Sequence, residues 1–371
     1  MNSPDVYKKL GIEPVINAQS WVTVLGGSLM KPEVLSAMNE ASSVFVDMIK
    51  LNKSAGDFIA KICNAEKGLI TSGCAAAQVL MVSACMTGKD ENKIDLLPSS
   101  DFEKNQVLLH SKQRNRYEKS FTMPGAEIIE FSSEEELKLL ISNKTACVAY
   151  VLAPWLSRGL GLSKTIDIAH EKEVPIIMDA AAELPPRSNL SKFIDMGVDL
   201  VAFSGGKGIQ GPQSTGFLAG KKELVEAAFM NSLNLHSELA GIGRPMKVSK
   251  ENIVGLVTAL QMFIDSDESK EWNDWLDKSQ NIKNSIKNIE GIIVTIEDDE
   301  ETRQGPTVVI RFADNYKGPQ LDEILFELEN GKPNIFVSTQ PNINEISLIM
   351  VNVQDGEEII IGERLREIFL N

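Results

Sequence analysis

Short apolar runs alternate along the first part of the chain with segments whose apolar residues recur every three or four positions. Such runs are typical of strands in a sheet buried on both faces, and they fall at 68–71, 107–110, 127–131, 146–152, 174–179 and 200–203. The periodic segments are typical of amphipathic helices, and clear examples fall at 32–48, 51–63 and 165–172. Repeated strand–helix alternation predicts a mostly parallel, doubly wound α/β sheet.

The pattern changes after a polar stretch that begins at Asp265. We expect a helix around Trp272 and Trp275, and then a mixture of short strands and helices typical of a smaller α+β domain. The expected strands are 292–296, 307–312, 335–339 and 346–353, and the expected helices are 321–329 and 356–369. The predicted organisation is an N-terminal segment (1–30) that packs on the small domain, a large domain (31–248) and a small C-terminal α+β domain (249–371).

One lysine follows a buried strand and a pair of glycines, in the sequence Ser204-Gly205-Gly206-Lys207. Open α/β sheets place their ligands at the carboxyl ends of their strands, and glycines allow the backbone to approach a ligand closely. The best single use for such a lysine is a Schiff base with pyridoxal 5'-phosphate (PLP). The alternative is a surface lysine in a glycine turn, and the motif alone does not decide between them.

Two further strand ends favour the cofactor. Asp179 ends the strand before Lys207, and a carboxylate against the pyridine nitrogen keeps the PLP ring protonated as an electron sink. Upstream, Ser72-Gly73-Cys74 joins a strand to a helix, and the free N–H groups of a helix N-terminus form a natural phosphate site. Phosphate cradle, ring carboxylate and lysine therefore appear in chain order, each at a strand end.

Several other polar residues are candidates with an equally plausible structural role. An aromatic or imidazole group often stacks on the PLP ring, and His110, Gln113 and Tyr117 are positioned for it, although His110 also fits a satisfied histidine at a strand end. Asn17 fits either the site or the cap of a turn. Arginines in this part of the chain fit an anionic substrate or simple solvation, and Arg244 and Lys247 lie on a Gly/Pro loop that suits a carboxylate or phosphate. These candidates include Arg114, Arg116, Arg158 and Arg187.

Composition narrows the class of protein. The chain has 371 residues, 43% of them hydrophobic, and a net charge of −15. The acidic charge argues against nucleic acid and anionic membranes as partners. The four cysteines form no CxxC pair, and neither a membrane span nor a secretory signal is evident. We therefore expect a cytoplasmic protein with reduced thiols and no bound metal.

These motifs resemble the selenocysteine-synthase-like branch of fold-type-I PLP enzymes. The resemblance covers about residues 5–265 and rests on 179–187, 204–213 and 243–247, together with 10–18 and 25–30. It implies the type I, aspartate aminotransferase-like PLP-dependent transferase fold, a homodimer or higher homo-oligomer, and PLP bound to Lys207. The phosphate would be held by Ser72, Gly73, Cys74 and Ser204, and the pyridine nitrogen by Asp179. The loop Gln213, Ser214 and Thr215 would serve a neighbouring subunit's site, and Gln113 stands where relatives often have histidine.

Within this branch the chain is most similar to ammonia-lyases that act on amino sugar acids. The resemblance implies conversion of D-glucosaminate 6-phosphate to 2-keto-3-deoxy-6-phosphogluconate and ammonia by Cα deprotonation and loss of the β-hydroxyl. Asn17, Arg158, Arg187, Arg244 and Lys247 are the candidates for substrate binding. Selenocysteine synthases grip a tRNA with an extra N-terminal domain, whereas this chain begins with the catalytic domain and is acidic, so the lyase is favoured. The alternatives are a transferase acting by β-replacement on a seryl derivative, and a non-catalytic PLP-binding protein.

Overall fold

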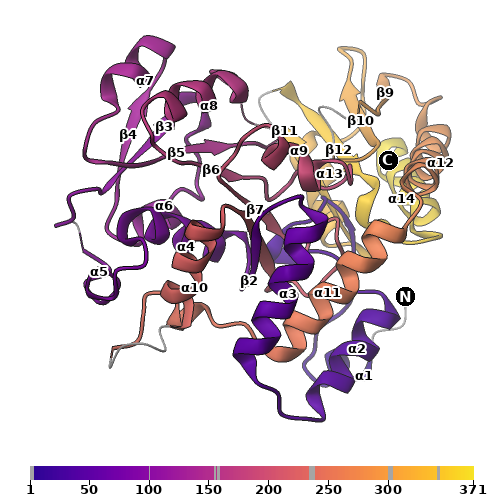
Figure 1. Ribbon diagram of the computed structural model, residues 1–371. Coiled ribbons are helices and arrows are strands. Elements are labelled where there is room, and N and C mark those ends of the chain that lie inside the picture. Colours follow the sequence, from indigo (N-terminus) through magenta and orange to yellow (C-terminus); the bar gives the residue numbers. More distant parts are fainter. Residues whose placement is uncertain are drawn as a thin grey trace. The chain divides into compact units, whose positions relative to one another are not determined.

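The computed structural model describes residues 4–99, 101–153, 156, 159–233, 239–299, 304–340 and 343–371. The chain divides into two compact units (Figure 1). The larger unit is Met30–Ser266, and the smaller unit combines Met1–Leu29 with Asp267–Asn371. Among the described residues, no helix is both long enough and apolar enough to cross a membrane, and no cluster of side chains suits a metal ion.

The larger unit is built on a seven-stranded sheet. The strand order is β2-β8-β7-β6-β5-β3-β4, and only β8 runs against its neighbours. This arrangement confirms the predicted mostly parallel α/β architecture. The strands are β2 (Lys67–Thr71), β3 (Gln106–His110), β4 (Glu127–Phe131), β5 (Thr145–Val151), β6 (Ile176–Asp179), β7 (Leu200–Ser204) and β8 (Gly216–Gly220).

Helices cover both faces of this sheet (Figure 1). Neighbouring strand residues point to opposite faces, so Leu200 packs with α4 and α10 while Val201 packs with α3 and α11. Burial on both faces explains why the strands are apolar throughout. The helices are α2 (Pro32–Ser42), α3 (Met48–Ile62), α4 (Cys74–Thr87), α5 (Glu91–Asp95), α6 (Lys119–Thr122), α7 (Glu134–Leu140), α8 (Leu162–Glu171), α9 (Asn189–Asp195), α10 (Lys222–Leu233) and α11 (Lys250–Asp265).

Helix α11 belongs to the larger unit, so the division falls after Ser266 rather than at residue 248 as the sequence suggested. Ser249 caps α11 through its side chain. Leu256 and Leu260 are fully buried in the core that α11 shares with α3 and the sheet. The polar stretch that begins at Asp265 marks the division more accurately than the end of the glycine- and proline-rich loop.

The smaller unit has a five-stranded sheet in the order β1-β11-β12-β10-β9. Strand β1 (Val15–Ala18) pairs in parallel with β11 (Asn334–Gln340), which ties the N-terminal segment to the C-terminal part of the chain. The remaining elements are α1 (Asp5–Lys8), α12 (Glu268–Ile286), β9 (Ile292–Glu297), β10 (Thr307–Phe312), α13 (Leu321–Glu329), β12 (Glu345–Ile349) and α14 (Glu357–Leu370).

A buried carboxylate joins three segments at the amino end of β7. The side chain of Asp199 is fully buried, and its Oδ2 accepts a hydrogen bond from the Ile176 N–H at 2.7 Å. The same oxygen lies 2.9 Å from His170 Nε2, and Oδ1 lies 2.5 Å from Lys221 Nζ. We expect Asp199→Ala to lower the free energy of unfolding by about 2–4 kcal/mol, because it leaves the buried Ile176 N–H unpaired and removes the buried carboxylate that joins His170 and Lys221.

Urea denaturation measures this effect, and Asp57→Ala is the matched control. Asp57 pairs with Lys67 at 3.2 Å, but its side chain is 57% exposed, so its removal should cost less than about 1 kcal/mol. Equal losses in the two variants would contradict the importance assigned to the buried network.

Candidate functional site

Asp179 lies at the carboxyl edge of the seven-stranded sheet. It is the last residue of β6 and pairs in register with Val151 of β5 and Ala202 of β7. Ser204 ends β7 and pairs with Gly216, the first residue of the antiparallel strand β8. The ends of β6 and β7 and the start of β8 therefore meet at one edge, where open α/β sheets bind ligands.

The Asp179 carboxylate is almost completely buried and is held by three donors. Its Oδ1 accepts from the Ala181 N–H at 3.0 Å and from the Cys74 thiol at 3.3 Å, and its Oδ2 accepts from Gln78 Nε2 at 2.6 Å. Burial raises the pKa of Asp179, while the hydrogen bonds and the charge of Lys207 oppose that rise. The three hydrogen bonds fix the orientation of the Asp179 carboxylate, which has little contact with solvent.

Lys207 comes close to this carboxylate. It is half-buried three residues after the end of β7, and its charge lowers the pKa values of both the Asp179 carboxyl and the Cys74 thiol against the larger effect of burial. Ser204, three residues before Lys207, pairs with Gly216, which lies against Gly73 and Cys74. The structure thus brings together the lysine, the aspartate and the start of α4.

Gly205 and Gly206, just before Lys207, let the loop at 213–215 pack closely against the backbone. A Cβ atom on Gly205 would lie 2.2 Å from Thr215 Oγ1, and one on Gly206 would lie 2.4 Å from Gln213 Cα. Thr215 is fully buried and its hydroxyl donates to the Pro212 carbonyl at 2.6 Å. Gln213 and Ser214 are exposed. Thr215 therefore stabilises the loop, and a role for this loop in a neighbouring subunit's site stays a prediction.

The N-terminus of α4 is the expected phosphate site, which we call the phosphate cradle (Ser72, Gly73 and Cys74). Gly73 precedes the helix with φ 122° and no capping side chain, and no atom lies within 4 Å of where its Cβ would be. Only glycine adopts this conformation readily, and the space beside Gly73 at the start of the helix is open. Ser72 and Ser204 are half-buried nearby in the two adjoining strand ends. This cradle, the buried carboxylate and the lysine fit the phosphate, ring nitrogen and aldehyde of PLP.

A second glycine holds this cradle against the sheet. A Cβ atom on Gly216 would lie 2.6 Å from the carbonyl carbon of Gly73 and 2.7 Å from the Cys74 nitrogen. We expect Gly216→Ala to displace the start of α4 and to weaken PLP binding at least about tenfold, since overpacking of this kind costs 1–3 kcal/mol. Fluorescence titration of the apoprotein with PLP measures the change.

Gly161→Ala is the control for that experiment. Gly161 precedes α8 with negative φ, and no atom lies within 4 Å of its Cβ position. This variant should bind PLP as the unaltered protein does. An unchanged affinity in Gly216→Ala would show that the position of the α4 N-terminus does not determine phosphate binding.

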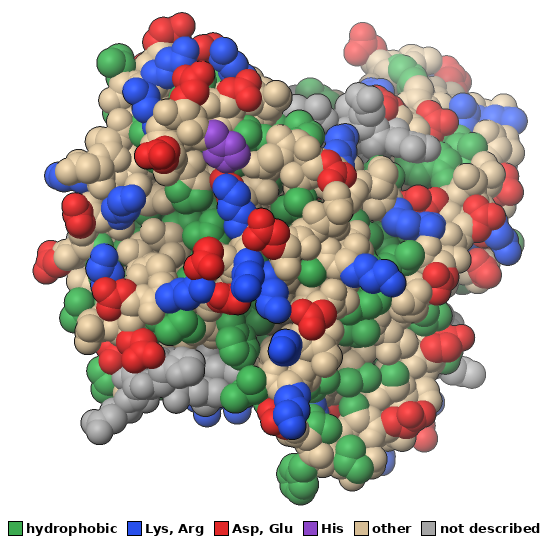
Figure 2. All heavy atoms as spheres, in the orientation of Figure 1, with side chains coloured by type: hydrophobic (Ala, Val, Ile, Leu, Met, Phe, Trp, Pro, Cys, Tyr) green, Lys and Arg blue, Asp and Glu red, His purple; other side chains and the backbone are tan. Residues whose placement is uncertain are grey.

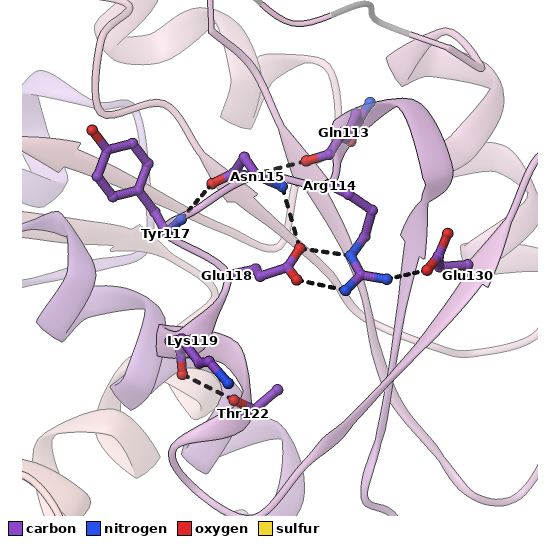
Figure 3. Close-up of polar contacts among 8 residues, drawn as sticks. All are labelled: Gln113, Arg114, Asn115, Tyr117, Glu118, Lys119, Thr122 and Glu130. Atoms are coloured by element: carbon purple, nitrogen blue, oxygen red, sulfur yellow. Dashed lines mark hydrogen bonds and ion pairs between the residues drawn. The ribbon is translucent and has the colours of Figure 1, made fainter.

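The three candidates for ring stacking have different environments. His110 is buried, its Nδ1 accepts from the Lys112 N–H at 3.1 Å, and its ring packs edge-on against Phe131 at 5.2 Å. Burial lowers the pKa of His110, so it has the features of the satisfied histidine considered above. Tyr117 is exposed (Figure 3). Gln113 is fully buried, and its Oε1 accepts from the Val151 N–H at 2.9 Å. Val151 belongs to β5 and pairs in register with Asp179 of β6.

The two neighbouring arginines, Arg114 and Arg116, contact side chains near them. Figure 3 shows the Arg114 guanidinium between Glu118 and Glu130, with Nε 2.6 Å from Glu118 Oε2. These carboxylates raise the pKa of Arg114 and accept hydrogen bonds from its Nε, Nη1 and Nη2 atoms. Arg116 lies over the Tyr117 ring at 5.8 Å.

Two of the expected substrate-binding residues, Asn17 and Arg187, have hydrogen-bond partners within their own unit. Asn17 Oδ1 accepts from the Gln19 N–H and its Nδ2 donates to the Ser20 carbonyl, both at 3.0 Å, so it stabilises a turn. Arg187 donates to the Ser266 carbonyl. Arg158 lies outside the described residues. The substrate-binding roles of these residues stay predictions.

Arg244 and Lys247 are exposed, and the start of their loop is anchored near the end of α4. Gly243 donates its N–H to the Asn231 carbonyl at 3.0 Å, and Asn231 Nδ2 donates to Thr87 Oγ1 at 3.1 Å. Thr87 ends α4, a helix of 14 residues that is about 20 Å long. The Gly243 end of the Gly/Pro loop therefore adjoins the end of α4 opposite to Cys74.

Comparison with known proteins agrees with this geometry. The aminotransferase class-V family model matches residues 38–331. A D-glucosaminate-6-phosphate ammonia lyase from Salmonella typhimurium is 30% identical over 99% of this chain and 98% of its own length. A solved structure of D-glucosaminate-6-phosphate ammonia-lyase aligns with a TM-score of 0.86 and 29% identity, covering 100% of this chain and 99% of that one.

Other relatives are named for different activities. A 5'-C-glycyluridine monooxygenase-decarboxylase from Streptomyces is 27% identical over 98% of this chain and 92% of its own length. An L-seryl-tRNA(Sec) selenium transferase from Carboxydothermus hydrogenoformans is 24% identical over 66% of this chain and 54% of its own length. The predicted type I PLP-dependent fold and the resemblance to the selenocysteine-synthase-like branch are confirmed. With a family match over more than half of its length, this chain belongs to the aminotransferase class-V family.

Proposed function

We propose that this protein is a PLP-dependent ammonia-lyase that converts an amino sugar acid, D-glucosaminate 6-phosphate, to 2-keto-3-deoxy-6-phosphogluconate and ammonia. The observation that carries the proposal is the buried Asp179 carboxylate beside Lys207 at the carboxyl edge of the sheet. The full-length similarity to the Salmonella lyase supports the substrate. That lyase is similar over both units, whereas the selenium transferase matches only part of this chain.

Each residue of the site has a distinct task in this proposal. When bound, PLP supplies an electron sink for the pair left at the substrate's Cα. Gly73, Cys74 and the adjoining Ser72 and Ser204 would hold its phosphate, and Asp179 would hold its ring nitrogen.

Lys207 would hold the aldehyde end and then carry the Cα proton. Its location between a buried carboxylate and a glycine turn lets the amine reach the reacting carbon while Asp179 keeps its own position. Proton transfer by a positioned group of this kind contributes roughly 10²–10⁴-fold to the rate. Departure of the β-hydroxyl and hydrolysis would then release ammonia.

Product analysis tests the substrate. We expect D-glucosaminate 6-phosphate to yield ammonia and a 2-keto acid in equal amounts, and unphosphorylated D-glucosaminate to react more slowly. Without product from either compound, the lyase proposal is wrong. β-Replacement on a serine derivative would instead support the transferase.

We also propose that the protein is a cytoplasmic homo-oligomer. The loop between α2 and α3 projects apolar side chains, with Val44 57%, Phe45 102% and Val46 46% exposed, and Figure 2 shows apolar atoms at this tip. Exposed apolar patches mark interaction sites, and a second copy of this chain is the partner that the family resemblance implies. Basic and acidic side chains are interspersed on the drawn face (Figure 2), which does not suit nucleic acid. The four free cysteines fit a reducing compartment.

We expect Phe45→Asp to shift the mass in solution toward the monomer, because a charge at the centre of an apolar contact is strongly unfavourable. Light scattering after gel filtration measures the mass. Leu139→Asp is the control, since Leu139 is an exposed apolar residue (83%) on helix α7 rather than in this loop. A monomeric unaltered protein, or an unchanged mass in Phe45→Asp, would contradict this interface.

A further inference from the structure

Gln78 is a buried amide on a helix that is otherwise mostly apolar. It lies one turn after Cys74 on α4, so the two side chains share a face, and it is 3% exposed. Its Nε2 donates to Asp179 Oδ2 at 2.6 Å, whereas its Oε1 is buried without a hydrogen-bond partner among the described residues. Leaving a polar atom buried and unpaired costs stability, so the fold alone would be served better by a methionine or leucine of similar volume.

The donors around Asp179 leave one oxygen with an open position. A carboxylate oxygen has two lone pairs. Oδ1 already accepts from Ala181 and from Cys74, whereas Oδ2 accepts only from Gln78 among the described residues. Oδ2 is therefore the atom able to accept one more donor, and Gln78 binds that same atom.

The orientation of the Gln78 amide depends on the charge of Asp179. An ionised carboxylate only accepts hydrogen bonds, so the amide must present its N–H₂ group and leave its carbonyl unpaired. A neutral carboxyl would allow the opposite orientation. The hydrogen bond from Gln78 to Asp179 thus leaves the Gln78 carbonyl without a partner among the described residues. This hydrogen bond favours the ionised form of Asp179.

We propose that Gln78 is a positioning residue that keeps Asp179 an ionised acceptor and directs its Oδ2 to the ring nitrogen of PLP. This inference rests on the proposed role of Asp179 in cofactor binding. Gln78 acts through Asp179, and Cys74 and Ala181 fix the other oxygen.

Gln78→Met and Gln78→Glu test the proposal in the PLP-loaded protein. The first variant removes the donor with little change of volume, and we expect weaker PLP binding by roughly ten- to hundredfold, the usual effect of a hydrogen bond to a charged group. The ring-nitrogen NMR shift of isotopically labelled PLP should also move toward the unprotonated form. Gln78→Glu should bind PLP well at acid pH, where the new carboxyl donates, and lose it as pH rises, because two carboxylates then face each other.

Ser83→Ala is the matched control. Ser83 is fully buried on the same helix, but its hydroxyl donates only to the Val79 carbonyl at 2.7 Å, so PLP affinity and the nitrogen shift should not change. Should Gln78→Met not accumulate, Gln78→Asn retains the amide but is one methylene too short to reach Oδ2, and the same losses are expected.

Asp179→Asn tests the role of Asp179 in ring protonation separately from the role of Gln78. Loss of ring protonation in Asp179→Asn but not in the Gln78 variants would overturn the role of Gln78 and leave that of Asp179 intact. An unchanged nitrogen shift in Asp179→Asn would overturn the role of Asp179 itself.

Discussion

Lys207→Ala should reduce ammonia release by at least about 10³-fold. The alanine removes both the amine that would hold the aldehyde of PLP and the group that would carry the Cα proton, and proton transfer alone contributes roughly 10²–10⁴-fold. The measurement is the steady-state rate with D-glucosaminate 6-phosphate, together with the visible absorption of the PLP-loaded protein. The spectrum should lose the band that depends on the covalent bond to the lysine.

Lys207→Arg is the control for charge. It keeps a cation near Asp179 and Cys74 but provides no amine that deprotonates at working pH, so it should be as inactive as the alanine variant. Lys221→Ala removes a lysine at the opposite edge of the sheet, beside Asp199, and should keep its activity. Turnover in Lys207→Ala close to that of the unaltered protein would show that another residue carries the chemistry.

Asp179→Asn should reduce turnover by at least about a hundredfold, since a preorganised charge at a reacting centre has this effect. At the same time, the apoprotein should be at least as stable as the unaltered protein at neutral pH. Ionised Asp179 is disfavoured by burial, and the Gln78 amide can turn its unpaired carbonyl toward the new amide. Loss of activity without loss of stability identifies a group that serves function rather than folding.

The pH dependence of this stability difference has a definite sign. Burial raises the pKa of Asp179 in the folded protein above its ordinary value of 3.8, so the folded state binds the proton more tightly than the unfolded chain. The stability linked to that proton is complete below pH 3.8 and falls as pH rises through the folded-state pKa. Urea denaturation of the two apoproteins from acid to neutral pH should show the asparagine variant gaining relative stability, and a gain in the acid direction would contradict the raised pKa.

The sheet and the parts of the site at strand ends were predictable from the sequence. Buried strands in this fold are apolar throughout, so Asp179 and Ser204 stood out as the first polar residues after such runs. Glycine before a helix indicated the phosphate cradle at Gly73 in the same way. These signals are local, and each lies within one element and the turn that follows it.

The rest depends on contacts between distant elements. Gln78 is not distinguished by the hydrophobic periodicity of the sequence, because α4 is buried nearly all round. Its spacing of four residues from Cys74 was the available indication. Arg244 seemed a candidate because of its loop, yet Asn231 ties that loop to the end of α4 farthest from the cradle. The sequence placed helix α11 in the small domain, whereas it belongs to the larger unit. The apolar face of a helix does not show which of two cores it enters.

The pairing of β1 with β11 has a consequence for biosynthesis. All strands of the seven-stranded sheet precede residue 221, so they can leave the ribosome and assemble before the second sheet has been translated. Strand β1 is made among the first residues but must wait for its partner at Asn334. At typical translation speeds that delay is roughly 15–60 s. During that interval the nascent chain exposes an unpaired strand, and unpaired strand edges favour aggregation, so we expect chaperones to cover β1 until β11 has been made.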